Sequence, residues 1–75
     1  MLNIKLSAGT RRTIVVNEEQ TVADVLTQEH VNTTGATISL DGAVLTDGEQ
    51  NSTFEELGAV DGSVLAAVVK ADSAR

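Results

Sequence analysis

The chain has 75 residues, eleven acidic and five basic side chains, and a net charge of −6 at neutral pH. This length suits one domain, and a hydrophobic fraction of 41% excludes disorder along the whole chain. The chain has no cysteine, which excludes disulfides, thiolate zinc sites and a cysteine nucleophile. The negative net charge argues against binding to nucleic acid or to anionic membranes, because both require a basic surface.

The first elements in the chain are two predicted strands. Residues 1–8 and 12–16 alternate between apolar and polar side chains, which is typical of strands with one buried face. The loop between them, residues 9–11, is short and contains Gly9. The sequence therefore predicts a β-hairpin at the start of the chain.

A short helix is predicted next, from Thr21 to His30. Thr21 is expected to cap it, and Asp24 brings negative charge to the positive end of the helix dipole. Gly35 is expected to end this segment in a left-handed conformation. The spacing of the apolar side chains predicts that one stripe of the helix faces the core: Val22, Val25 and Leu26.

The second half of the chain is divided by Asp–Gly pairs, which favour turns because glycine enters positive φ without a clash. The pairs at residues 41–42 and 47–48 are expected to bracket a short strand, and residues 37–40 form the strand before them. A single capped helical turn is predicted from Ser52 or Thr53 onward, with Phe54 and Leu57 on its inner side.

The last strand is predicted at residues 63–69. It is apolar on both of its faces, which is typical of a central strand. We therefore expect one mixed sheet that wraps over the helix, with the first and last strands side by side at its centre. The connection through the helix is long enough for a crossover. The domain is expected to span residues 1–70, and residues 71–75 to form a flexible polar tail.

Four segments, in this order and spacing, resemble the ubiquitin-like β-grasp family. The helix start at residues 20–26 resembles the "T-V-x-x-L" motif of that superfamily and of its bacterial sulfur carriers. Residues 38–48 resemble the family's apolar strand, glycine turn and "L-x-D-G" in succession, and the remaining similarity lies in residues 53–58 and 62–69. The resemblance implies an α+β fold, in which a mixed sheet of four or five strands packs on one short helix, in the order ββαββ with a helical turn before the last strand.

The chain departs from this family at its end. Conjugated ubiquitin-like proteins and sulfur carriers end in Gly-Gly, whereas this chain ends at residues 71–75 without glycine and has no Gly-Gly pair anywhere. We therefore expect a protein that is not conjugated. The residues at the positions that match ubiquitin's apolar recognition patch also differ from those of ubiquitin. In this chain we expect them to be Ser39 and Ala67.

The sequence offers no enzyme chemistry. His30 is the sole histidine and is expected near the exposed end of the helix, with no catalytic partner in view. Asp41, Asp47 and Glu49 do not have the spacing of a calcium loop and are expected to form turns. No catalytic, cofactor-binding or metal-ligating residue is predicted.

The sheet face turned away from the helix is the candidate binding surface. Strand parity predicts that it carries Lys5, Thr13, Val15, Ser39, Leu65, Ala67 and Val69. Val15, Leu65 and Val69 are more apolar than an exposed face requires. Exposed apolar patches often mark partner sites. A basic rim is expected to attract an acidic partner and comprises Lys5, Arg11, Arg12 and Lys70.

The leading hypothesis is a non-enzymatic, ubiquitin-like module from a bacterial or phage-type cytoplasm that binds a protein partner through this outer face. No nucleic-acid or membrane partner is expected, and the chain is expected to be a monomer or a weak homo-oligomer. Two alternatives stay open. One is a diverged sulfur-carrier-like protein, and the other is a structural subunit that self-associates through the short edge strand at residues 43–45.

Overall fold

The computed structural model describes residues 1–69, so the tail predicted at residues 71–75 and the predicted domain end at residue 70 lie outside the described residues. Five strands and two helices follow one another along the chain. Their bounds are β1 (Leu2–Ala8), β2 (Thr10–Val16), α1 (Val22–Gln28), β3 (Ala36–Leu40), β4 (Ala43–Val44), α2 (Asp47–Gln50) and β5 (Val64–Val69).

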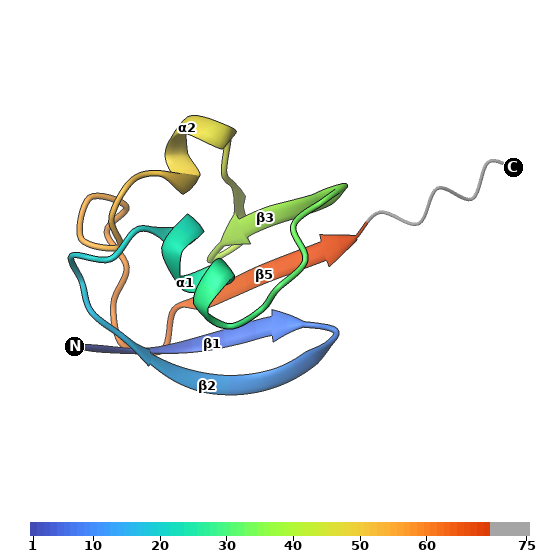
Figure 1. Cartoon of the computed structure of the whole chain (residues 1–75). Coiled ribbons are helices and arrows are strands. Elements are labelled where there is room, and N and C mark those ends of the chain that lie inside the picture. Colours follow the sequence, from blue (N-terminus) through green and yellow to red (C-terminus); the bar gives the residue numbers. More distant parts are fainter. Residues whose placement is uncertain (70–75) are drawn as a thin grey trace, which may run out of the picture.

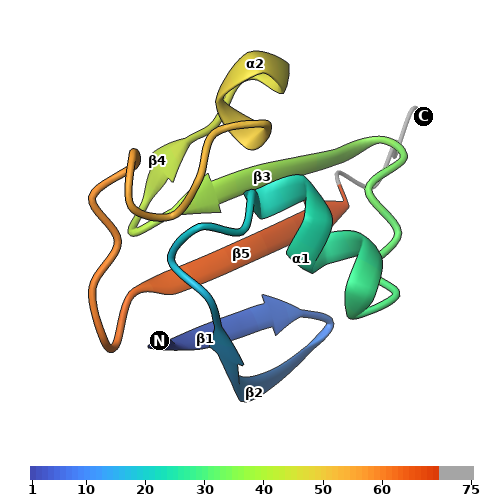
Figure 2. The same cartoon turned by 60° about the vertical axis from the view of Figure 1, so that its left-hand side comes forward.

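The strands form one mixed sheet in the order β2-β1-β5-β3-β4. β1 and β5 run parallel, whereas the hairpin β1–β2 and the pairs β3–β5 and β3–β4 are antiparallel. The first and last strands are therefore neighbours inside the sheet, as the sequence predicted. Helix α1 lies across one face of this sheet, and α2 lies near its β4 edge (Figures 1 and 2). The predicted α+β architecture is confirmed.

The core lies between the sheet and α1 and consists mainly of aliphatic side chains. The helix stripe predicted from the sequence is buried, and Phe54, the chain's sole aromatic, is fully enclosed. The buried hydrophobic residues are Ile4, Leu6, Val16, Val22, Val25, Leu26, Ile38, Leu40, Leu45, Phe54, Leu65 and Ala67. Each fully buried aliphatic side chain stabilises the fold by roughly 1.5–3 kcal/mol, so a small domain depends on nearly all of them.

Helix α1 begins as predicted but ends differently. Thr21 is the N-cap, and its Oγ1 accepts a hydrogen bond from the Asp24 N–H at 3.1 Å. At the other end His30 takes the left-handed conformation, with φ of 58°; Gly35 also has positive φ (72°), but it lies in the turn before β3.

The His30 N–H donates to the Thr27 carbonyl at 3.1 Å, and the Val31 N–H donates to the Leu26 carbonyl at 2.8 Å. This pair of bonds is a Schellman motif. The prediction that the segment up to Gly35 ends the helix is wrong, whereas the left-handed conformation predicted for Gly35 is present in the turn before β3. The chain turns earlier because Val31 packs against the core.

The two Asp–Gly pairs have different roles. At the first pair, both Asp41 (φ 52°) and Gly42 (φ 87°) have positive φ, as a two-residue hairpin turn requires. The second pair begins α2 and is no turn, so that prediction is wrong. Thr46 caps α2 in a capping box. Its Oγ1 accepts from the Glu49 N–H at 3.2 Å, and Glu49 Oε1 accepts from the Thr46 N–H at 2.9 Å. The reciprocal cap outweighs the glycine because two helix-end donors are satisfied at once.

A second reciprocal cap forms the predicted turn around Phe54. The Glu56 N–H donates to Thr53 Oγ1 at 3.1 Å, and the Thr53 N–H donates to Glu56 Oε1 at 2.9 Å. The Phe54 N–H also donates to the Gln20 carbonyl at 3.1 Å. The cap fixes the turn that contains Phe54, and the bond to Gln20 joins this turn to the loop before α1. Both contacts hold Phe54 in the core.

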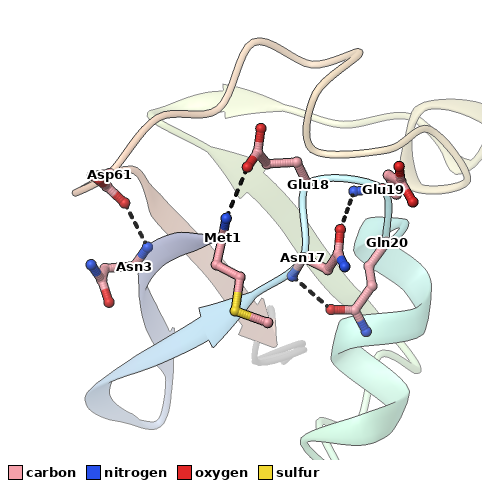
Figure 3. A network of polar contacts seen from close by, with 7 residues as sticks. All are labelled: Met1, Asn3, Asn17, Glu18, Glu19, Gln20 and Asp61. Carbon is pink, nitrogen blue, oxygen red and sulfur yellow. Dashed lines mark hydrogen bonds and ion pairs between the residues drawn. The ribbon is translucent and has the colours of Figure 1, made fainter.

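Side-chain hydrogen bonds hold the loops at the end of the sheet where the chain begins (Figure 3). Asp61 Oδ1 accepts from the Asn3 N–H of β1 at 2.9 Å, which links the loop before β5 to the first strand. The other contacts are Met1 amine to Glu18 Oε1, Asn17 N–H to Gln20 Oε1, and Glu19 N–H to Asn17 Oδ1, each 2.9 Å. The loop from β2 into α1 therefore enters the helix in one defined conformation.

Candidate functional site

The two faces of the sheet are unlike. One face packs on α1 and the core, whereas no element of the described residues covers the other, which we call the outer face (Figures 1 and 2). Successive side chains of a strand point to opposite faces, so the ladder partners show which residues share the outer face. Lys5, Thr13 and Val15 are exposed there, and Ser39 is half-buried, as predicted.

The predicted side for β5 is wrong. Leu65 is 0% and Ala67 8% exposed, and both belong to the core. Val69 has the same parity and so points to the helix side, although it is exposed at the strand's end. The outer side of β5 carries Val64, Ala66 and Val68 instead.

The reason for the error is the register of β5. An apolar strand gives no sign of which parity faces the core, and a shift of one residue exchanges the two faces. Leu65 stands opposite Leu6 of β1 and Leu40 of β3, both of which are buried. The two neighbouring strands therefore place Leu65 inside.

The register also removes Ala67, which was predicted on the outer face, from that surface. On the outer face Ser39 stands opposite Ala66, not Ala67, and opposite Val44 of β4. Small side chains thus form the middle of this part of the face. Larger apolar side chains surround them: Val44 is 65%, Val68 58% and Val64 39% exposed.

Apart from the exposed Val15, the hairpin half of the outer face is polar and basic. Lys5 stands opposite Thr13 and Val64, and Ser7 stands opposite Arg11 and Ala66. A shallow groove of about 550 Å³ crosses β2, β1 and β5 at this place. Its lining is Lys5, Ser7, Arg11, Thr13, Val64 and Ala66 from the outer face, together with Leu6 and Arg12, whose parity places their side chains on the opposite face. The site therefore has an apolar half on β5, β3 and β4, and a basic half on the hairpin.

Arg12 points to the other side of the hairpin, toward the end of α1. Its Nη1 pairs with Glu29 Oε1 at 2.8 Å, and its Nη2 donates to the Glu29 carbonyl at 3.3 Å. The pair borders a second groove, of about 480 Å³, with His30 and Val31. His30 is exposed, and its imidazole has no hydrogen-bond partner within residues 1–69. Among residues 1–69, therefore, no hydrogen-bonded pair of the kind that orients a catalytic histidine involves His30.

Of the three carboxylates considered for a cation, Asp41 and Glu49 accept hydrogen bonds that hold the fold. Asp41 Oδ1 accepts from the Val64 N–H and its Oδ2 from Ser63 Oγ, both at 2.9 Å, which joins the β3–β4 turn to β5. Asp47 lies in the first turn of α2, and Glu49 completes its cap. No group of three or more His, Asp or Glu side chains in residues 1–69 could hold a metal ion.

The edge strand is shorter than expected. β4 has two residues, and Leu45, which was predicted to extend it, lies in the core at 7% exposure. Sequence reasoning also missed the link from Asp41 to β5, for which the sequence contains no signal, because the partners are more than twenty residues apart.

The mixed sheet with its parallel central pair β1–β5 and the helix across one face has the ubiquitin-like β-grasp fold. Among solved structures, the chain is similar to a ubiquitin-like protein from the hyperthermophilic archaea Caldiarchaeum subterraneum, with a TM-score of 0.52. The two sequences are 21% identical over 92% of this chain and 94% of that one. No family model matches the chain, and a search of curated proteins finds no match either. The structural likeness confirms the fold that the sequence resemblance implied.

The two helices within residues 1–69 are both too short to cross a lipid bilayer.

Proposed function

We propose that this chain is a non-enzymatic, ubiquitin-like interaction module that binds a protein partner through the outer face. The observation that carries the proposal is the set of exposed apolar side chains on β5 and β4, the two strands on either side of β3 in an uncovered sheet, namely Val64, Val68 and Val44. Burial of such side chains favours association, and exposed apolar patches with polar borders often mark protein interfaces.

The shape of this face supports the same function. Ala66 and Ser39 stand opposite each other between larger neighbours, so the surface has small side chains in the middle. An apolar side chain of a partner fits there with close packing, which is how the central contacts of interfaces stabilise binding.

The proposal is tested by a matched pair of variants. Val68→Asp places a charge on the outer face, whereas Val60→Asp places the same charge at an equally exposed valine in the loop before β5; the two wild-type side chains are 58% and 61% exposed. Tagged wild-type chain is used to capture partners from extracts of the source organism, and quantitative mass spectrometry identifies them. We expect a protein that is retained by wild type and by Val60→Asp and lost with Val68→Asp. Equal retention by both variants would show that the outer face is not the binding surface.

A further inference from the structure

Charge is strictly separated within this fold. Within residues 1–69, no carboxylate side chain lies on a strand: every Asp and Glu lies in a helix or a loop. The Lys and Arg side chains of the same residues all lie on the β1–β2 hairpin, and they are Lys5, Arg11 and Arg12. Although the chain has a net charge of −6, the charged side chains on its sheet, within the described residues, are therefore all positive.

The three cations are not equivalent. The charge of Arg12 is compensated by Glu29 on the helix side, at 2.8 Å. Lys5 and Arg11 are exposed on the outer face and have no ion pair within the described residues. Arg11 is the diagonal neighbour of Lys5, because Lys5 pairs with Thr13 two residues along β2. Diagonal neighbours in an antiparallel pair stand about 7–8 Å apart, so both cations can reach neighbouring carboxylates of one ligand.

These two cations border an apolar strand. Lys5 stands opposite Val64, and Ser7, which lies between Arg11 and β5, stands opposite Ala66. The groove at this place thus has positive charge on one side and small apolar side chains on the other. A free anion uses only the first of these features. An extended peptide that alternates carboxylate and apolar side chains uses both.

The remaining surface selects against other polyanions. Nucleic acid requires a basic footprint that follows its phosphates over a long distance. The helices and loops beyond the hairpin carry all the acidic side chains of the described residues, so they repel a long polyanion. A short acidic segment of a protein avoids this repulsion.

We infer that the partner presents an acidic, extended segment that binds in the groove between Lys5 and Arg11 on one side and Val64 and Ala66 on the other. This inference rests on the proposed function and specifies the chemistry of its partner. The carboxylates of the segment pair with Lys5 and Arg11, and its apolar side chains pack on β5.

The test is an NMR titration of the full ¹⁵N-labelled chain with a short capped peptide of alternating Glu and small apolar residues. In the wild-type chain we expect the amide shifts to concentrate on the residues that line the groove. In the double variant Lys5→Gln/Arg11→Gln we expect the affinity for the peptide to fall at least tenfold. Arg12→Gln is the matched control. Arg12 also borders the groove, but its guanidinium pairs with Glu29 on the helix side, so we expect the affinity of this variant to stay within twofold of wild type. Raising the salt concentration to about 0.5 M should weaken binding, since it screens exposed charges.

Several results would overturn the inference. They are equal weakening by Arg12→Gln and by the double variant, equal binding of a peptide with Gln in place of Glu, and tighter binding of inorganic phosphate or of a single-stranded oligonucleotide than of the acidic peptide. As a control for folding, the NMR spectrum of each variant is compared with that of wild type, and equal chemical-shift dispersion indicates that the fold is kept.

The capture experiment separates this inference from the proposed function. If a partner is lost with Val68→Asp but retained by Lys5→Gln/Arg11→Gln, the outer face binds the partner and the acidic-segment inference is wrong. If both variants lose the same partner and Arg12→Gln retains it, both are supported.

Discussion

The two faces of the sheet are built from the same strands and yet differ in almost every physical property. On the inner face, Leu65 meets Leu6 and Leu40 and has no exposed surface. On the outer face its chain neighbour Val64 meets Lys5 and remains partly exposed. Adjacent residues of one apolar strand therefore have different roles, one in stability and the other at the surface. The apolar character of a β5 residue therefore does not by itself assign that residue to the core or to a binding surface.

The largest expected effect comes from the inner face. Leu65→Ala removes a fully buried side chain from the centre of the sheet and leaves a cavity, so we expect a loss of about 2–5 kcal/mol in the free energy of unfolding. Val64→Ala is the control on the outer face, with an expected loss below about 1 kcal/mol, because the valine is already partly hydrated. Urea denaturation followed by circular dichroism measures both. Similar losses for the two variants would contradict the assignment of the faces.

The second effect concerns the contact that holds β5 in its register. Asp41→Ala removes both acceptors from the Val64 N–H and Ser63 Oγ, and it leaves an alanine at φ of 52°. Because Ser63 is buried, we expect a loss of about 1–3 kcal/mol. Asp41→Asn keeps one carbonyl acceptor and tolerates the positive φ, so it should recover part of the stability. Hydrogen exchange of the Val64 amide provides a local readout, and unchanged protection in Asp41→Ala would show that the contact does not hold the strand.

The third effect lies where the helix leaves the inner face. His30 has a left-handed conformation that costs a non-glycine residue free energy, roughly 1 kcal/mol or more. His30→Gly should therefore raise the free energy of unfolding by about 0.5–1 kcal/mol, as glycine usually does at this position of a Schellman motif. His30→Ala retains the strain and should give no gain. A stabilising effect of both variants would mean that the imidazole itself, and not the backbone, is unfavourable.

The smallest effect on stability is expected on the outer face. Lys5→Gln/Arg11→Gln changes exposed side chains without an ion pair in residues 1–69, so the free energy of unfolding should stay within about 0.5 kcal/mol of wild type. Thermal unfolding at low salt measures this. A large destabilisation would place these cations among the residues that hold the fold together and would contradict the difference between the two faces.

Much of the architecture could be predicted from local patterns. Alternation in residues 1–16 predicted the hairpin, Thr21 predicted the start of α1, and Asp41-Gly42 predicted the turn after β3. Each of these signals acts over a few neighbouring residues. For the same reason they do not depend on the rest of the fold.

Local patterns were insufficient where two signals competed. Asp47-Gly48 has the composition of a turn, but the cap between Thr46 and Glu49 makes it the start of a helix. At the end of α1, the glycine signal favoured Gly35, whereas packing of Val31 made His30 the turning point. In both places a specific contact outweighed an average preference.

The sequence by itself determined the order of the strands and of α1, and the central position of the last strand, because these depend on composition and short-range periodicity. Only the tertiary structure decided which side chains of β5 face outward, and so which residues can meet a partner. Both parities of that strand are apolar, and the choice between them is made by the buried neighbours on β1 and β3. The tertiary structure also brought Lys5 and Arg11 together beside an apolar strand. Pairing across the hairpin and with β5 joins residues that are distant in the chain.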